Sequence, residues 1–191
     1  MTTITVVRKG GQVAIAADSL TTFGETRLAA GYQTSRKIFR VGDSWIGLAG
    51  SAAHAPVLRR ALALLPAAGR RLDSRDAIFD TFVRLHPVLK DQFFLNTKED
   101  DDDPYESSQF TMLVANPSGI YGVYSYREVF EFERFWAMGS GRSFALGAMH
   151  AGFAGASSAR DLAALGVQAG CEFDKNSGGP VRLHTLTLRP A

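Results

Sequence analysis

Cysteine is almost absent from this chain of 191 residues, in which Cys171 stands alone. A single cysteine excludes an intrachain disulfide and a Cys-x-x-Cys metal site, and such a residue is commonly a small buried hydrophobe. The four histidines lie on unrelated segments without the paired spacing of metal ligands. We therefore expect neither a metal nor another cofactor, and we assign Cys171 no catalytic role.

Long hydrophobic runs are missing as well. No stretch approaches the ~20 apolar residues of a membrane span, and the first residues lack the apolar core of a secretory signal. Basic and acidic residues nearly balance, at 21 and 19, and the arginines are scattered rather than gathered into a nucleic-acid-binding stripe. These absences predict a cytoplasmic protein that has neither a membrane nor a nucleic acid as its partner.

What the chain does contain is the composition of an ordinary globular protein, with 46% hydrophobic residues. Its length favours one domain over residues 1–191. Residues 3–9 and 12–18 are rich in β-formers, and the glycines at positions 10 and 11 between them are typical of a tight hairpin turn. The chain therefore begins inside a sheet.

Strand and helix patterns alternate in blocks after this hairpin. A polar stretch over 19–35 separates it from two short strands, at 37–41 and 44–50. The spacing of apolar residues then predicts helices at 52–65 and 73–94, strands at 109–116, 119–126 and 128–139, helices at 143–154 and 158–173, and a last strand at 181–188.

Three local features carry expectations of their own. Asp73 or Ser74 is placed to cap the second helix, and Pro87 predicts a kink or a restart of that helix near Leu85. The acidic run from Glu99 to Asp103 predicts an exposed loop rather than a cation site, because like charges repel and the ligand spacing of a calcium loop is missing.

The order of these blocks indicates the fold class. A doubly wound parallel sheet alternates strands and helices one for one, whereas this chain places groups of strands between pairs of helices. We therefore predict an α+β fold in which two antiparallel sheets pack face to face and helix pairs flank them.

The segment GSGRSFALG at 139–147 has the small residues of a phosphate loop but lacks its chemistry. Phe144 occupies the third glycine position of the dinucleotide fingerprint, and the Walker lysine is missing. Met138 stands where a nucleophile elbow needs glycine. The simplest role left for Ser140 is to cap the following helix.

Thr2 offers more specific chemistry, because removal of Met1 would give it a free α-amino group beside its hydroxyl. With a reference pKa of about 8, that amine can act as the base for the hydroxyl nucleophile. Such a site needs a cation, an anion that holds the cation, and N–H donors for an oxyanion. Asp18, Lys37 and the Gly50-Ser51 step are placed to supply them, although spacing alone favours a surface ion pair of Asp18 and Lys37.

Several segments together resemble one family, the proteasome β-type peptidases of the N-terminal-nucleophile hydrolases, which include bacterial HslV. Within it, the chain is most similar to the β-proteobacterial proteasome homologues. The resemblance extends in order over nearly the whole chain and rests on TTITVVRKGGQVAIAADS, RKIF, LAGSAAH, MGSGRSFALGAMHAG and DKNSGG.

The resemblance implies a four-layer αββα sandwich and a role for each matching residue. Thr2 would be nucleophile and base, Asp18 and Lys37 the charge pair beside it, and Gly50 an oxyanion donor. Ser140, Asp174 and Ser177 would be the supporting polar groups around the terminal amine. Thr21, Leu48 and Ala52 would form the pocket for the side chain before the cleaved bond, with a preference for apolar or small residues.

The same resemblance implies a threonine peptidase that cleaves unfolded polypeptides inside stacked rings of identical subunits, six or seven to a ring. An ATP-dependent unfoldase is a candidate partner. Two alternatives remain open from the sequence: a non-catalytic ring or scaffold subunit of the same fold, and an amidase of the same superfamily that acts on small molecules.

Overall fold

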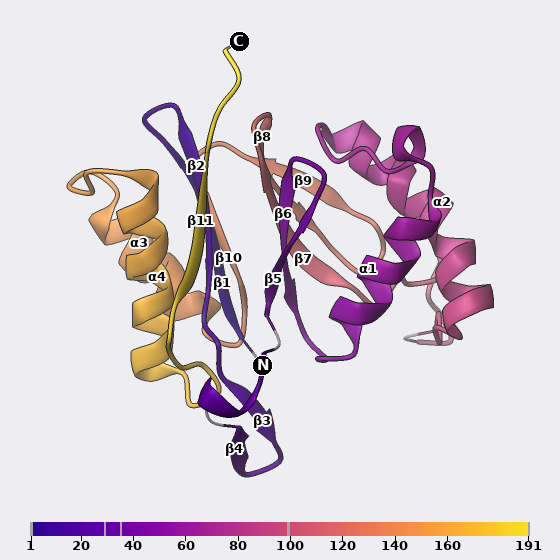
Figure 1. The fold of residues 1–191 in the computed structure, drawn as a ribbon, viewed down its shortest axis with the longest axis horizontal. Coiled ribbons are helices and arrows are strands. Elements are labelled where there is room, and N and C mark those ends of the chain that lie inside the picture. The colour runs from indigo at the N-terminus through magenta and orange to yellow at the C-terminus, as the bar shows by residue number, and fades with distance from the viewer. Residues whose placement is uncertain (1, 29, 35, 99, 191) are drawn as a thin grey trace.

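The computed structural model describes residues 2–28, 30–34, 36–98 and 100–190. Within them, two antiparallel sheets pack face to face and a pair of helices covers the outer face of each sheet (Figure 1). The expected α+β sandwich of four layers is therefore confirmed.

The first sheet is built around the predicted N-terminal hairpin. Its turn consists of Gly10 and Gly11, whose φ values of +59° and +72° are ones that glycine adopts without strain. The strand order is β10–β1–β2–β11, with each pair antiparallel. The bounds are β1 (Thr3–Lys9), β2 (Gln12–Ala17), β10 (Phe135–Gly139) and β11 (Arg182–Thr187).

The second sheet contains the strands of the middle of the chain in sequence order, β5 to β9, again with each pair antiparallel. Its edge strand β5 begins directly after Lys37, so this lysine is the last residue of the connection from the first sheet to the second. The bounds are β5 (Ile38–Val41), β6 (Ser44–Ala49), β7 (Thr111–Asn116), β8 (Gly119–Val123) and β9 (Val129–Phe132).

The helices form the two outer layers. One pair buries apolar residues such as Leu58 and Phe82 against the second sheet, and the other pair buries Met149 and Leu162 against the first. The bounds are α1 (His54–Leu64) and α2 (Arg75–Phe93) on the second sheet, and α3 (Arg142–Gly152) and α4 (Ala159–Phe173) on the first. Two short 3-10 turns, Ala30–Tyr32 and Ala67–Gly69, lie in connections.

Strand β1 shows how the sequence alternation places polar groups inside the molecule. Ile4 and Val6 are fully buried in the cluster between the two sheets. Thr3 and Thr5 point to the other side, where the Thr5 hydroxyl donates to the Ala163 carbonyl of α4 at 2.9 Å. Because side chains alternate along a strand, the face of β1 with Thr3 and Thr5 lies toward α4, whereas the face with Ile4 and Val6 lies toward the second sheet.

The predicted strand over 128–139 is in fact two strands in different sheets. β9 ends at Phe132 on the edge of the second sheet, and β10 begins at Phe135 on the edge of the first. The chain crosses between the sheets at residues 133 and 134. The Arg8 N–H donates to the Arg134 carbonyl on the far side of the crossing, at 2.6 Å.

The polar stretch at 19–35 also differs from the expected loop. It contains a small hairpin of β3 (Thr21–Phe23) and β4 (Thr26–Leu28). The hairpin extends from the lower end of the molecule in Figure 1, near the chain's N-terminal end. Most of its residues are exposed or half-buried, so the hydrophobic alternation that would have revealed two strands is missing from this stretch.

The second helix begins as predicted, and of the two candidate caps Ser74 is the one used. Its side chain accepts the Ala77 N–H at 3.2 Å. The expected restart near Leu85 was wrong, because α2 continues through Pro87 to Phe93. Pro87 has no N–H to donate to the Val83 carbonyl. Both residues lie on the exposed face of the helix, where water can replace the missing hydrogen bond.

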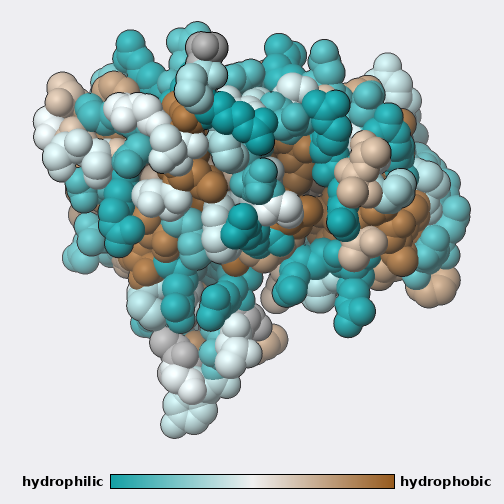
Figure 2. All heavy atoms as spheres, turned by 45° about the horizontal axis from the view of Figure 1, so that its top comes forward, coloured by the Kyte–Doolittle hydropathy of each residue, from teal (hydrophilic) through white to brown (hydrophobic). Residues whose placement is uncertain are grey.

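The acidic run lies on the surface, as the repulsion of its charges predicts. Asp101 is paired with Lys98 at 2.8 Å, and both side chains are largely exposed. Glu99 lies outside the described residues. Figure 2 shows hydrophilic side chains over most of the visible face of the molecule, with hydrophobic patches between them. Among the helices of the described segments, none has the length and apolar character needed to cross a membrane.

Candidate active site

Thr2 lies at the end of the first sheet where β1 begins, and the residue is only 3% exposed. The hairpin register pairs Ile4 with Ala17, so the residue after β2, Asp18, comes to lie beside Thr3. The Asp18 N–H donates to the Thr3 carbonyl at 3.1 Å, and the Thr3 N–H donates to Asp18 Oδ1 at 3.0 Å. The two ends of the hairpin therefore meet at Thr2.

Asp18 is a buried carboxylate that accepts backbone N–H groups and a lysine. Besides the Thr3 N–H, it accepts the N–H groups of Leu20 and Gly178 on Oδ2 at 3.1 and 3.0 Å. Lys37 Nζ donates to Oδ1 at 2.7 Å, with 0% of the Asp18 side chain and 16% of the Lys37 side chain exposed. The surface ion pair that spacing alone permits is therefore not what the structure shows.

Lys37 is held in an environment that works against its positive charge. Burial lowers the pKa of its ammonium group, and the attraction and hydrogen bond of Asp18 only partly oppose this shift. A lysine whose pKa is lowered by burial next to a fixed carboxylate is a frequent feature of functional sites.

A second group of polar residues reaches Thr2 from the other side of the sheet. The Thr2 N–H donates to Ser140 Oγ at 3.2 Å. Ser140 in turn donates to Asp174 Oδ2 at 2.6 Å, and Ser177 donates to the same oxygen at 2.7 Å. Ser177 Oγ also lies 2.7 Å from Thr3 Oγ1, which closes the network onto the start of β1.

Ser140 does not cap α3, so the simplest expectation for it was wrong. The residue at the cap position is Gly141, and no side-chain cap bond is present there. The Ser140 hydroxyl is directed instead toward Asp174 and Thr2 because β10 ends beside the start of β1, with Gly139 opposite Thr3.

Asp174 is kept ionised by its hydroxyl neighbours. Burial alone would raise the pKa of this carboxyl group, but the hydrogen bonds from Ser140, Ser177 and Asn176 outweigh it and hold the pKa below its ordinary value. The carboxylate lies at the end of α4 and is 8% exposed. It therefore orients the Ser140 and Ser177 hydroxyls from a largely buried position.

The glycines around Ser140 explain why this segment is so rich in small residues. Gly139 has a φ of +97°, and a side chain there would overlap the Thr2 carbonyl oxygen. A side chain on Gly141 would overlap Thr3 Oγ1. The GSG sequence is therefore a requirement for close approach to Thr2 rather than a remnant of a phosphate loop.

Gly50 follows the end of β6 and precedes α1. Its φ of +105° is one that residues with side chains rarely adopt. The imidazole of His54, in the first turn of α1, lies directly against this glycine, 3.4 Å from the position that a Cβ would take. His54 Nδ1 is buried and has no partner among the described residues, and burial lowers the pKa of the ring.

The three predicted substrate residues lie on separate elements near this end of the molecule. Thr21 begins β3 and is half-buried, and Ala52 lies exposed between Gly50 and α1. Leu48 is 6% exposed and packs in the cluster under α1 and α2, while its N–H donates to the Lys37 carbonyl at 3.1 Å. This bond ties Leu48 to the backbone of the charge pair.

Sequence reasoning missed two residues of the site. Thr3 joins both networks, through its N–H to Asp18 and its hydroxyl to Ser177. Cys171 on α4 interacts electrostatically with Asp18, Lys37 and Asp174, and its pKa is raised to about 11, by burial above all. The alternation of β1 indicates that Thr3 faces α4, but no sequence signal places Cys171 near Lys37.

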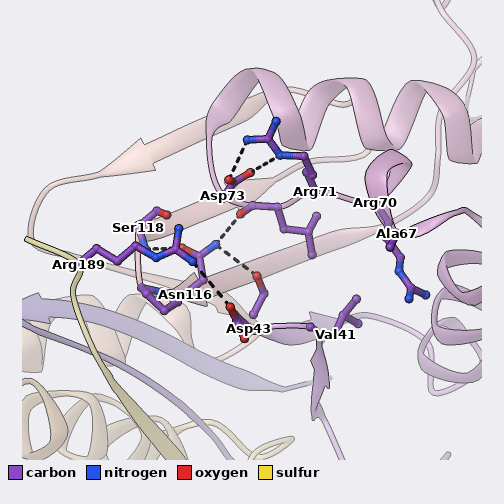
Figure 3. A pocket seen from close by; sticks show the side chains of 13 residues that line it. Val41, Asp43, Ala67, Arg70, Arg71, Asp73, Asn116, Ser118 and Arg189 are labelled. Atoms are coloured by element: carbon purple, nitrogen blue, oxygen red, sulfur yellow. Dashed lines mark hydrogen bonds and ion pairs between the residues drawn. The ribbon is translucent and has the colours of Figure 1, made fainter. Parts of the chain in front are cut away.

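One cavity of the molecule does not belong to this site. It measures about 330 Å³ and lies between the β5–β6 turn, the β7–β8 turn and the connection before α2 (Figure 3). The Arg189 N–H donates to the Pro117 carbonyl, and the Leu188 N–H donates to the Gly11 carbonyl. The cavity is therefore at the Gly11 end of β1, roughly 23 Å from Thr2 along the strand.

Two of the three arginines around this cavity are paired with carboxylates. Arg71 donates two hydrogen bonds to Asp73, and Arg189 lies 3.7 Å from Asp43. Figure 3 shows both pairs at the rim, with Asn116 bonded between them and Arg70 directed away. Neither paired arginine has its charge left for a ligand.

Two antiparallel sheets between helix pairs, with a threonine where the first strand begins, are the architecture of the N-terminal-nucleophile hydrolases. The family model for the proteasome subunit matches residues 1–185, and the chain belongs to that family. No curated protein sequence matches the chain significantly.

Two solved structures of BPH from Thiobacillus denitrificans show how closely the chain follows a bacterial member of the family. The free protein is 44% identical with a TM-score of 0.90, covering 99% of this chain and 100% of that one. The complex with epoxomicin is 42% identical with a TM-score of 0.89, covering 98% and 100%. The sequence-based resemblance to bacterial proteasome homologues is confirmed.

A more distant structure has the same fold. Eukaryotic HslV from Trypanosoma brucei is 23% identical with a TM-score of 0.66, and the alignment covers 97% of this chain and 99% of that one. At this identity the likeness concerns the fold alone.

Proposed function

We propose that this chain is a threonine peptidase that cleaves unfolded polypeptides. The observation that carries the proposal is that two polar networks meet at the start of β1. One contains Asp18 and Lys37 and accepts the Thr3 N–H, and the other contains Ser140, Asp174 and Ser177 and accepts the Thr2 N–H. Membership of the proteasome subunit family supports the same activity.

The proposed reaction begins with the removal of Met1, which lies outside the described residues. The Thr2 nitrogen, 3.2 Å from Ser140 Oγ, then becomes an α-amine with a reference pKa of about 8. The positive charge of Lys37 lowers that pKa further, so more of the amine is unprotonated near neutral pH.

Thr2 Oγ1 then attacks the carbonyl carbon of a peptide bond while the amine takes its proton. The oxyanion that forms is stabilised by the Gly50 N–H. The amine returns the proton to the leaving nitrogen as the peptide bond breaks, which leaves the acyl group esterified to Thr2. Water, activated by the same amine, hydrolyses the ester and restores the hydroxyl.

The charge pair and the hydroxyl network have separate roles in this scheme. Asp18, with three backbone N–H bonds besides Lys37, holds the ammonium group in one place. Ser140 and Ser177, both bonded to Asp174, orient the amine and the start of β1. The side chain before the cut would enter beside Thr21, Leu48 and Ala52, where Leu48 favours an apolar or small residue.

We further propose that the peptidase acts in stacked rings of identical subunits, hexameric or heptameric, in the cytoplasm. Such rings would confine cleavage to chains that are already unfolded, and an ATP-dependent unfoldase is the candidate partner that supplies them. Family membership supports the ring.

The decisive experiment combines intact-mass measurement with hydrolysis of a fluorogenic peptide panel and of an unfolded protein. We expect a mass that lacks Met1 and turnover that Thr2→Ala abolishes while the particle size stays unchanged. Ser143→Ala, which removes a hydroxyl from the exposed face of α3, is the matched control and should retain activity.

The two other functions predict different results. A scaffold subunit would retain Met1 and show no hydrolysis with any substrate. A small-molecule amidase would lose Met1 yet cleave neither peptides nor unfolded protein. Unchanged peptide hydrolysis in Thr2→Ala would remove Thr2 from the mechanism.

A further inference from the structure

A second cavity lies where the open edges of the two sheets approach each other. It measures about 270 Å³ and is lined by Arg36 and Ile38 at the start of β5, by residues 181–184 at the start of β11 and by Arg160 in the first turn of α4. Both strands are edge strands, β5 of the second sheet and β11 of the first. Figure 1 shows β11 in the left-hand sheet and β5 in the right-hand one.

The charged groups of this cavity are all basic. Arg36, Arg160 and Arg182 line it together with His184. Within residues 2–28, 30–34, 36–98 and 100–190, no carboxylate oxygen lies within 4 Å of any of the three guanidinium groups. In the other cavity two of the three arginines, Arg71 and Arg189, have carboxylate partners, so the two cavities differ in how far their arginine charges are balanced.

The acidic side chain next to Arg160 in α4 is already engaged. The Asp161 carboxylate accepts the hydroxyls of Ser157 and Ser158, each at 2.6 Å, and these bonds, together with the charge of Arg160, lower its pKa. Burial, Arg36 and Arg182 hold the pKa of His184 below its ordinary value. The positive field of the arginines therefore reaches the floor of the cavity.

The floor itself is rigid. The His184 ring stacks on Trp45 of the opposite sheet, with centroids 3.5 Å apart and planes 7° from parallel. Ile38, which is 3% exposed, forms the neighbouring wall. Above this floor, three exposed guanidinium groups with no carboxylate oxygen within 4 Å among the described residues repel one another, and an anion bound among them would reduce that repulsion.

We propose that this cavity is a binding site for a phosphate-class oxyanion. Guanidinium groups donate paired hydrogen bonds to tetrahedral oxyanions and remain charged at every physiological pH. Arg36 would approach the anion from the segment just before β5, Arg182 from β11 and Arg160 from α4, so the bound anion would join three layers of the fold. The site is independent of the proposed peptidase chemistry, since none of its arginines belongs to the Thr2 networks.

Calorimetric titration of the full assembled protein with inorganic phosphate tests the proposal, in low-salt buffer free of other oxyanions. We expect saturable binding by the wild type and at least about tenfold weaker binding by Arg36→Gln/Arg182→Gln. The matched control is Arg60→Gln/Arg75→Gln, which removes the same charge from exposed positions of α1 and α2 and should bind as the wild type does.

Thermal unfolding separates loss of the site from loss of the fold. Without phosphate, Arg36→Gln/Arg182→Gln should unfold at the same temperature as the wild type or higher, because repulsion is relieved. Phosphate should then stabilise the wild type and the control only. If the double variant unfolds early, Arg160→Gln, which alters no strand, gives the same comparison.

Two results would overturn the proposal. One is the absence of saturable phosphate binding by the wild type, which would follow if an acidic segment of a second copy filled the cavity. The other is equal loss of binding in the control variant, which would show that net charge rather than the cavity attracts the anion.

Discussion

Asp174 shows at the scale of a single residue how the site resists protonation. One carboxylate oxygen accepts the hydroxyls of Ser140 and Ser177 at 2.6 and 2.7 Å. Burial raises the pKa of the carboxyl group, but these hydrogen bonds lower it further, and the net shift is downward. The folded protein therefore binds this proton less readily than the unfolded chain does.

The sign of this shift predicts the pH dependence of stability. Asp174 contributes stability above the ordinary Asp pKa of about 4, and the contribution is lost as the pH falls through that value toward the lower folded pKa. Asp174→Asn should lower the free energy of unfolding by about 2 kcal/mol near neutral pH, since hydrogen bonds to a charged group are removed. The difference from the wild type should shrink below pH 4.

Urea unfolding of both proteins between pH 3 and 7 measures this difference. The control is Asp43→Asn, because that carboxylate lies on the surface and 69% of its side chain is exposed. A constant difference between Asp174→Asn and the wild type across this range would contradict the assignment of the shift to Asp174.

The residues of the site differ in how far the sequence alone could predict them. Thr2, Asp18 and Lys37 were found because each residue type has a defined role in nucleophilic chemistry, and the hairpin turn at Gly10-Gly11 brings the first two together. Ser140, Asp174 and Ser177 came from family resemblance alone. Cys171 could not be found, because its place near Lys37 depends on how α4 packs on the sheet.

At the scale of elements, two glycines in or near α3 have opposite effects on stability. Gly139 ends β10 with a φ of +97°, and a Cβ there would overlap the Thr2 carbonyl. Gly147 lies inside α3 on its exposed side, and nothing lies within 4 Å of the position its Cβ would take. The first glycine is required by geometry, whereas the second only weakens a helix.

Alanine substitution at the two glycines tests this contrast. Gly139→Ala should destabilise the protein by roughly 2 kcal/mol or more through backbone strain and displacement of Thr2, and peptide hydrolysis should fall with it. Gly147→Ala should stabilise by up to about 1 kcal/mol, because alanine is the better helix former. Chemical denaturation and hydrolysis rates measure both. Equal behaviour of the two variants would contradict the close approach at Gly139.

The type of most elements could be predicted from the sequence, but not where one of them divides. Residues 128–139 alternate like one long strand, and no glycine, proline or asparagine marks the crossing at Glu133 and Arg134. The break comes from tertiary packing, since β9 and β10 pair with different sheets. Pro87 is the reverse case, because a strong local signal for a helix break did not end α2, which continues to Phe93.

At the scale of the whole molecule, the order of layers follows from the block order of strands and helices, and that much was predicted. Which sheet each strand joins was not, because pairing such as that of β6 with β7 joins residues more than 60 positions apart. The chain alone also leaves several large apolar side chains on its outer layers exposed. These bear on the proposed assembly.

Phe144 and Phe173 form such a pair on the outer layer of α3 and α4. Their ring centroids are 5.6 Å apart, and the residues are 43% and 68% exposed. Leu165, on α4 as well, is 40% exposed. Exposed aromatic residues gathered on one helix face are typical of an interaction surface, and in the proposed stacked rings we assign this face to the contact between copies of the chain.

Phe144→Glu/Phe173→Glu should therefore separate the assembly into smaller particles without unfolding the subunit, because neither ring fills the core and the introduced charges repel their counterparts across the contact. Light scattering after size-exclusion chromatography measures the particle mass, and circular dichroism verifies the fold. Phe94→Glu is the control, since Phe94 is 87% exposed at the end of α2, on the opposite outer layer. A double variant that retains the wild-type mass would show that the rings stack through another face, whereas loss of mass in Phe94→Glu alone would transfer the contact to the layer of α1 and α2.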